Sequence, residues 1–182
     1  MNSKENNVAV IYRTKYGATK RYAEWISEKL GAKIFSVSEF DASTLNSYST
    51  VLFGSSVHVG KIKGIDFVKN NWNVLSSKKV VVFASTGAPK IEPEQELVIN
   101  DCLPAGICQD VKYYPLPGAY NYNKLDFTDK LLMNLGPIAN LRFKKWFKGD
   151  KKAEEQLAVF RNAQDWTSKE AVSPIVEYLR AK

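Results

Sequence analysis

The sequence predicts a doubly wound α/β fold, in which helices cover both faces of a parallel β-sheet. Three observations support this class. Short apolar segments alternate along the chain with segments of helical periodicity. The segments 51–53 and 80–83 are apolar at consecutive positions, as strands buried on both faces require. The first apolar segment, 8–12, leads through a glycine-containing loop into a helix.

Five strands and three helices follow from these patterns. Strands are expected at 8–12, 33–37, 50–54, 79–84 and 111–116. Helical spacing of apolar residues predicts helices over 20–30 and 65–75. A last helix follows a cap at Thr167 or Ser168, and Pro174 requires that it start late or kink.

Length and composition predict one domain. A chain of 182 residues with 45% apolar content can bury one good core, so a single domain over 1–182 is expected. No run approaches the roughly 18 to 20 apolar residues of a membrane span, and the polar start 1–7 does not resemble a signal peptide. We therefore expect a soluble, cytoplasmic protein.

The cysteines and the single histidine argue against a metal site. Cys102 and Cys108 are too few for a disulfide scaffold, and His58 is the only histidine. We expect no bound metal. Buried free thiols are the simplest interpretation of the cysteines, and a redox pair is the alternative.

The net charge of +7 indicates an anionic partner. A basic surface can attract nucleic acid, an anionic membrane face or an acidic small molecule. The cations form no single Lys/Arg block and no nucleic-acid recognition motif is present, so nucleic acid is not expected.

The loop from Thr14 to Thr19 has the features of a phosphate site. Gly17 lets the backbone approach an anion, the helix start supplies free N–H groups, and Thr14 and Thr19 can each donate an O–H. The loop lacks the Gly-Lys-Ser/Thr ending of a nucleoside-triphosphate loop and the three glycines of a dinucleotide site. The structural alternative is an ordinary tight turn capped by Thr19.

The loop is part of a longer motif with a defined spacing. The motif consists of two aliphatic residues, an aromatic residue, hydroxyl residues, a small residue and two further apolar residues. The residues are Val10, Ile11, Tyr12, Thr14, Gly17, Thr19, Ala23 and Ile26. This order resembles the FMN-phosphate motif of the flavodoxin family. The resemblance implies a flavodoxin-like sheet of order 2-1-3-4-5 and the cofactor FMN. Its phosphate would be held by Thr14, Lys15, Tyr16, Gly17, Ala18 and Thr19.

In that fold, ligands bind beyond the carboxyl ends of the strands, where two further loops would flank the flavin ring. The resemblance places its contacts at Ser55, Ser56, Val57, His58, Gly60, Ser85, Thr86 and Gly87. His58 is the candidate catalytic side chain, because an imidazole can stack on the ring or pass protons during its reduction. The alternative is an exposed loop histidine without a role.

A basic insertion of helical character follows the fifth strand, over about residues 119–150. Residues 119–152 hold eight Lys/Arg against three Asp, which accounts for +5 of the net +7. Residues 141–148 interleave aromatics with cations, as in a helix on a membrane surface or one that binds an acidic aromatic ligand. Alternatively, the insertion packs its leucines on the body and exposes a solvated basic face.

Four local patterns extend the resemblance to one branch of the family. They are the Gly-Ala-Tyr-x-Tyr run at 118–122, the Asp-Lys-Leu-Leu-Met helix start at 129–133, the Asp-Trp pair at 165–166, and a small-Ser-aliphatic-basic-x-Gly order at 55–60. They resemble the menaquinone-dependent protoporphyrinogen IX dehydrogenases. The resemblance implies an enzyme of haem biosynthesis that oxidises protoporphyrinogen IX and passes electrons to a quinone at the inner face of the membrane. Tyr120 and Tyr122 are the candidate substrate contacts.

Two other functions remain open. A flavodoxin-type electron carrier would have a redox partner protein and no substrate of its own. The basic charge argues against it, because free flavodoxin carriers are typically acidic. A protein of this fold without flavin would stay colourless when FMN is added.

Overall fold

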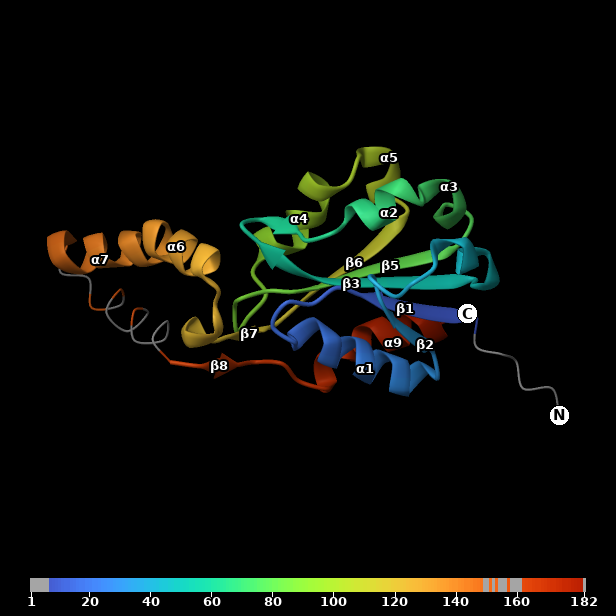
Figure 1. Cartoon of the computed structure of the whole chain (residues 1–182), viewed down its shortest axis with the longest axis horizontal. Coiled ribbons are helices and arrows are strands. Elements are labelled where there is room, and N and C mark those ends of the chain that lie inside the picture. The colour runs from blue at the N-terminus through green and yellow to red at the C-terminus, as the bar shows by residue number, and fades with distance from the viewer. Residues whose placement is uncertain (1–6, 149–150, 152, 154–156, 158–161, 182) are drawn as a thin grey trace. The chain divides into compact units, whose positions relative to one another are not determined.

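The computed structural model describes residues 7–148, 151, 153, 157 and 162–181. The chain forms two compact units (Figure 1). The sheet unit comprises Met1–Gly118 with Thr167–Lys182, and the helical unit comprises Ala119–Trp166. That 1–182 forms one domain with an insertion at about 119–150 stays a prediction.

The sheet unit is built on five parallel strands. They are β1 (Val8–Tyr12), β2 (Lys33–Ser36), β3 (Thr50–His58), β5 (Lys79–Ser85) and β6 (Val111–Leu116), in the order β2-β1-β3-β5-β6. The two-residue strand β4 (Lys61–Ile62) pairs antiparallel with the end of β3. The predicted fold class is confirmed. The numbering differs from the expected 2-1-3-4-5 because β4 was not predicted.

Helices cover both faces of this sheet, as Figure 1 shows. Apolar side chains alternate along each strand, so Val10, Leu52 and Val81 pack beneath α1 (Ala18–Leu30) and α9 (Ser173–Arg180). The residues next to them in each strand, such as Ile11 and Phe53, face the opposite side of the sheet. That side is covered by α2 (Asp66–Asn70), α3 (Trp72–Leu75), α4 (Pro93–Cys102) and α5 (Ala105–Cys108).

One helical prediction needed correction, and the late start expected for the last helix is confirmed. The helix expected over 65–75 is broken at Asn71, whose backbone leaves the helical region at φ −107° and ψ 13°. Its side-chain amide donates to Phe67 O at 2.8 Å, a local bond that competes with helix continuation. The last helix begins late, since a 3₁₀ turn (Glu170–Val172) precedes α9 and Pro174 sits in the first turn.

The helical unit begins with β7 (Ala119–Tyr120), which pairs antiparallel with β8 (Gln164–Asp165). Between them lie a 3₁₀ turn (Tyr122–Lys124), α6 (Phe127–Leu135) and α7 (Pro137–Lys148). Asp126 caps α6 by accepting from Asp129 N at 2.8 Å. Ile138 and Leu141 of α7 pack with Ala153 and Leu157. The compact unit extends beyond the predicted end near residue 150.

Candidate functional site

Three loops of the sheet unit meet at one edge of the sheet. Tyr12 lies beside Gly54, and Ser56 lies beside Ser85, so β1, β3 and β5 end at neighbouring positions. The edge where adjacent parallel strands end is where open α/β sheets bind ligands. The predicted site residues of the sheet unit are therefore brought to the same edge.

The loop after β1 presents an anion-binding helix start. Gly17 has φ 94°, a left-handed conformation, and Thr14 Oγ1 accepts from its N–H at 2.9 Å. Helix α1, 13 residues long, begins at the next residue with no side-chain cap and no acid in its first turn. The N–H groups and the dipole of this helix favour a negatively charged group such as a phosphate.

Thr19 joins this helix to the end of β5. Its side chain is buried, and its Oγ1 lies 2.9 Å from Ser85 Oγ. Each hydroxyl has one proton and can also accept a hydrogen bond. If Ser85 donates to Thr19, then the Thr19 proton is available to an anion at the helix start. The pair therefore fits both the phosphate prediction and the alternative in which Thr19 fixes the turn.

The second predicted loop is a β-hairpin, which corrects the expectation that the third strand ends at Gly54. Strand β3 continues to His58, which pairs with Lys61 across the turn Val59-Gly60. Both turn residues have positive φ, 49° and 69°, as a two-residue hairpin of matching twist requires. Val59 is β-branched and therefore strained in this conformation.

Hydrogen bonds hold the far side of this hairpin to β3. Ser55 Oγ donates to Lys63 O at 2.6 Å, and Lys63 N donates to Ser56 O at 3.0 Å. The Arg13 side chain lies over Gly64, where a Cβ would stand 3.0 Å from Arg13 Cδ. The loops after β1 and β3 are thus in direct contact.

The third loop depends on a glycine that sequence reasoning missed. Thr86 N and Thr86 Oγ1 both donate to Leu116 O, at 2.9 Å and 3.3 Å. A Cβ at Gly118 would lie 1.8 Å from Thr86 O, so only glycine fits there. Nearby, Tyr22 Oη donates to Pro117 O at 2.6 Å and ties α1 to the chain after β6. The Pro-Gly pair after the fifth strand was the available signal.

The residues predicted to contact the flavin ring differ in how far their side chains are buried or exposed to a ligand. Ser55, Ser85 and Thr86 are buried, and the hydroxyls of all three make hydrogen bonds within the protein. Contacts to a ligand are therefore expected from backbone groups and from the more exposed residues. Ser56, Val57 and His58 are half-buried, whereas Gly60 and Gly87 are exposed. All of them lie at the ends of β3 and β5 or in the turns that follow.

The two candidate substrate tyrosines lie in the helical unit. Tyr120 is in β7, and Tyr122 Oη accepts from Asn134 Nδ2 at 2.6 Å. Burial, together with the neighbouring Tyr122, raises the pKa of the Tyr120 phenol to about 12. The Tyr120 phenol therefore stays protonated near neutral pH. The role of Tyr120 and Tyr122 toward a substrate stays a prediction.

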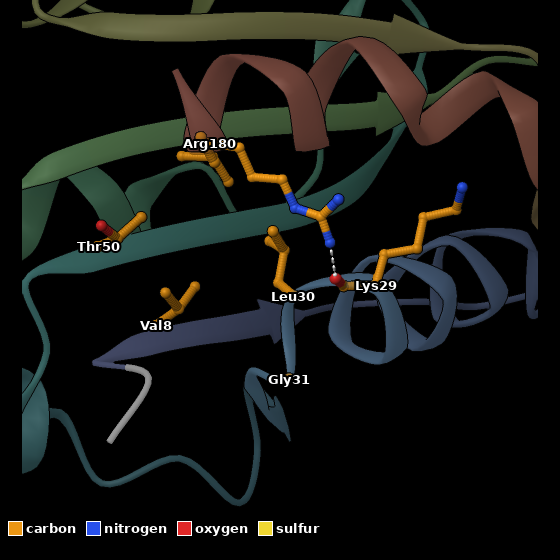
Figure 2. A pocket seen from close by; sticks show the side chains of 7 residues that line it. Val8, Lys29, Leu30, Gly31, Thr50 and Arg180 are labelled. Atoms are coloured by element: carbon orange, nitrogen blue, oxygen red, sulfur yellow. Dashed lines mark hydrogen bonds between the residues drawn. The ribbon is translucent and has the colours of Figure 1, made fainter. Parts of the chain in front are cut away.

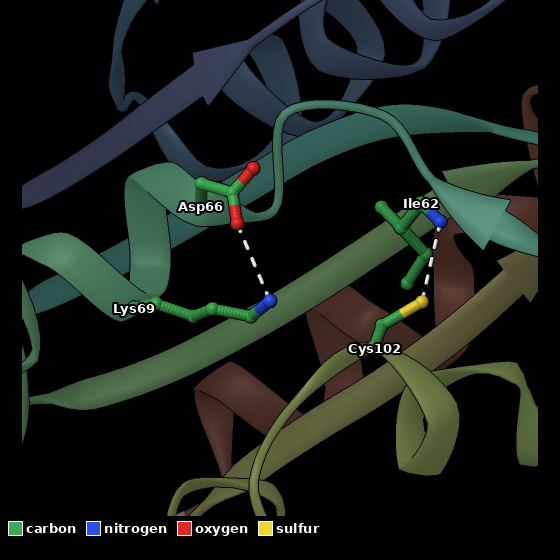
Figure 3. Close-up of polar contacts among 4 residues, drawn as sticks. All are labelled: Ile62, Asp66, Lys69 and Cys102. Atoms are coloured by element: carbon green, nitrogen blue, oxygen red, sulfur yellow. Dashed lines mark hydrogen bonds and ion pairs between the residues drawn. The ribbon is translucent and has the colours of Figure 1, made fainter.

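The thiols lie on α4 and α5, on one face of the sheet. Cys102 is buried, and its Sγ accepts from Ile62 N at 3.3 Å (Figure 3). Cys108 is half-buried and donates to Asn100 Oδ1 at 3.0 Å; burial raises the pKa of its thiol. Both are free, and no potential metal-binding cluster of His, Cys, Asp or Glu occurs among residues 7–148 and the other described positions.

A hollow of about 450 Å³ lies at the other end of the sheet (Figure 2). Val8 and Thr50, which begin β1 and β3, form part of its lining, and Arg180 Nη2 donates across it to Lys29 O at 2.6 Å. It offers carbonyls from the end of α1, where the helix dipole is negative. The carboxyl edge, where open α/β sheets bind their ligands, remains the candidate site for FMN.

A family model described as a flavodoxin domain matches residues 9–137. Among solved structures, a flavodoxin from the domain Archaea is 22% identical over 44% of this chain and 62% of its own length, with a TM-score of 0.40. A flavodoxin, WrbA-like protein from Agrobacterium tumefaciens is 14% identical over 58% and 74% of the two chains, with a TM-score of 0.44.

The two-electron reduced flavodoxin of Megasphaera elsdenii is 19% identical over 59% of this chain and 84% of its own, with a TM-score of 0.43. No curated protein sequence matches this chain significantly.

Proposed function

Because the chain belongs to the flavodoxin domain family, whose cofactor is FMN, we propose that it is an FMN-dependent oxidoreductase with the flavin at the carboxyl edge of the sheet. The uncapped start of α1 behind the left-handed Gly17 carries this assignment. It offers backbone N–H groups and a favourable dipole to a phosphate, and the first turn holds no acid that would repel it.

The residues of the edge fit the cofactor. Thr14, Lys15, Gly17 and Thr19 would hold the phosphate, and Lys15 adds a positive charge to the loop. The hairpin turn after His58 and the loop at Thr86–Gly87 would flank the ring. Bound there, FMN supplies the redox chemistry by accepting and releasing electrons at its ring. His58 is placed at the start of the hairpin turn, where an imidazole can hold or pass a proton.

We assign protoporphyrinogen IX as the substrate and a quinone as the electron acceptor. The residue patterns of the helical unit and of the hairpin support this choice. The charge of the helical unit also suits a substrate with carboxylate side arms. Helix α7 carries Arg142, Lys144, Lys145 and Lys148 and no acid, and such cations pair well with propionates.

The same helices suit a membrane surface, where a quinone would be met. Phe127 and Leu135 of α6 are 81% and 72% exposed, and Trp146, which lies among the α7 cations, is 79% exposed. Exposed aromatic and aliphatic side chains with neighbouring cations are typical of helices that lie on anionic lipid. No helix among the described residues is long and apolar enough to cross a bilayer. We therefore propose peripheral binding through α6 and α7.

The substrate proposal is tested by mixing FMN-loaded protein with protoporphyrinogen IX without oxygen. Flavin bleaching and porphyrin fluorescence are followed together. Bleaching in step with rising fluorescence, and faster than in free FMN at the same concentration, supports the dehydrogenase. A protein that retains FMN but shows no bleaching contradicts the substrate and leaves an electron carrier as the better description.

The tyrosines provide a matched pair of variants for the same assay. Tyr122→Phe removes the hydroxyl that accepts from Asn134, and Tyr120→Phe removes the phenol of raised pKa. If either phenol contacts the porphyrinogen, its loss raises the KM for that substrate without changing FMN retention. Tyr114→Phe, in the sheet unit, is the control and leaves both values unchanged.

A further inference from the structure

The loops around the candidate flavin site carry cations and no acids. We call these side chains the cationic rim: Arg13, Lys15, Lys61, Lys63 and Lys90. They come from three loops, and the sequence between 13–20, 54–65 and 85–91 contains no Asp or Glu. A single-sign ring of charge around a site steers oppositely charged partners toward it.

The fold brings these cations to one edge. Arg13 lies over Gly64, next to Lys63, and Lys61 pairs with His58 across the hairpin. All five rim residues are exposed. Within the described chain, no ion pair ties Arg13, Lys61 or Lys63 to an acid. Lys15 is assigned above to the FMN phosphate, so the charge offered to a partner comes mainly from Arg13, Lys61 and Lys63.

The acids that directly follow the second and third loops in the sequence are stabilised by other contacts. Asp66, just beyond the hairpin, pairs with Lys69 at 3.3 Å (Figure 3). The Glu92 side chain accepts from the backbone in the capping box of α4. Glu94 follows in the first turn of that helix, where the helix dipole favours a carboxylate. Asp66 begins α2, and Glu92 and Glu94 lie at the start of α4, so in the sequence these acids follow the rim loops and do not interrupt them.

Exposed apolar side chains lie within the same loops. Tyr16 is 44% exposed and Val59 is 75% exposed, at the first loop and at the hairpin tip. The Val59 backbone is strained, so the turn presents this side chain to solvent at a cost in stability. Apolar contacts surrounded by charge are typical of protein docking surfaces.

We propose that the cationic rim is the docking surface for an acidic electron-transfer protein. Carboxylates of the partner would meet the rim, and its redox centre would exchange one electron with the flavin at this edge for each encounter. A small anion would engage only one or two of the cations, whereas charge from three loops around apolar side chains fits a protein face. The proposal depends on FMN at this site and not on the porphyrinogen.

A plant-type [2Fe–2S] ferredoxin, which is strongly acidic, serves as the probe. The oxidised ferredoxin is titrated calorimetrically into FMN-loaded protein, so that binding is measured without electron transfer. We expect measurable binding at about 20 mM salt and a loss of about tenfold or more in affinity at about 200 mM. Basic cytochrome c in the same titration is expected not to bind.

Matched charge reversals localise the binding. Lys61→Glu with Lys63→Glu changes the rim, and Lys33→Glu with Lys112→Glu makes the same charge change on exposed strand residues away from the loops. We expect the rim pair to weaken ferredoxin binding by about tenfold or more and the control pair by less than about twofold. FMN fluorescence quenching shows that both variants still hold the cofactor.

Three outcomes would overturn the proposal. The first is the absence of ferredoxin binding by FMN-loaded protein, and the second is an equal loss in the two variants, which would indicate net charge alone. The third is binding to phosphatidylglycerol vesicles that depends on Lys61 and Lys63 when ferredoxin does not bind, which would assign the rim to membrane. A failure to oxidise porphyrinogen affects none of these readouts.

Discussion

Removing the hydroxyls at Thr14 and Thr19 tests the phosphate site. A hydrogen bond to a charged group contributes about 2 kcal/mol, which corresponds to about thirtyfold in affinity. Thr14→Ala combined with Thr19→Ala is therefore expected to raise the Kd for FMN by at least about thirtyfold. Losing the buried Thr19–Ser85 contact, 2.9 Å long, also lowers the free energy of unfolding of the FMN-free protein by about 1 kcal/mol.

The two effects are separated by assay and by control. Quenching of FMN fluorescence gives the Kd, and urea unfolding without FMN gives the stability. Thr19→Ser keeps the hydroxyl and is expected to retain most of the affinity. If the double variant binds FMN as the parent does while its stability falls, then the hydroxyls only fix the turn and the phosphate assignment is wrong.

Two further substitutions and one chemical modification have expected outcomes in simple assays. Gly118→Ala places a Cβ 1.8 Å from Thr86 O and should cost about 3 kcal/mol or more in urea unfolding; a cost below about 1 kcal/mol would contradict the packing. Val59→Asn relieves the strain at φ 49° and should add about 1 kcal/mol, whereas lower stability would show that the turn is not strained. Native protein should react with a thiol reagent only at Cys108, and slowly, because burial raises its pKa; rapid reaction of Cys102 would contradict its burial.

Much of the sheet unit could be predicted because its signals are local. Strand 8–12 and strand 111–116 have the predicted bounds, and α1 starts two residues earlier than expected. Each of these elements is encoded by a contiguous apolar pattern with turn residues at its ends. The Thr14–Thr19 loop was recognisable for the same reason, since its glycine and hydroxyls lie within six residues.

The hairpin after β3 escaped prediction because its turn has an unusual residue. Two-residue turns with positive φ favour Asn-Gly or Asp-Gly, and here the first position is Val59. A β-branched residue at that position reads as strand or loop and not as a turn. The hairpin is held instead by contacts from outside the turn, such as Ser55 Oγ to Lys63 O.

Other features depend on residues far apart in sequence. Gly118 is required by Thr86, which lies in a different loop. The local Pro117-Gly118 pair indicates a turn, but it does not reveal the close contact that excludes a side chain. The helical unit reaches Trp166 because β7 pairs with β8, and that pairing joins Ala119 to Asp165. The excess of Lys and Arg indicated where this unit begins in the sequence. Its end is defined only by the pairing of β7 with β8, which are far apart in the sequence.

The location of FMN is the central claim, and NMR tests it most directly. Amide resonances of the labelled protein are followed while FMN is added. We expect the largest shifts at Gly17, Ala18 and Thr19, with further shifts at Gly60 and Gly87. Shifts gathered at Gly31 and Thr50, which line the hollow at the opposite end of the sheet, or no shifts at all, would contradict the account.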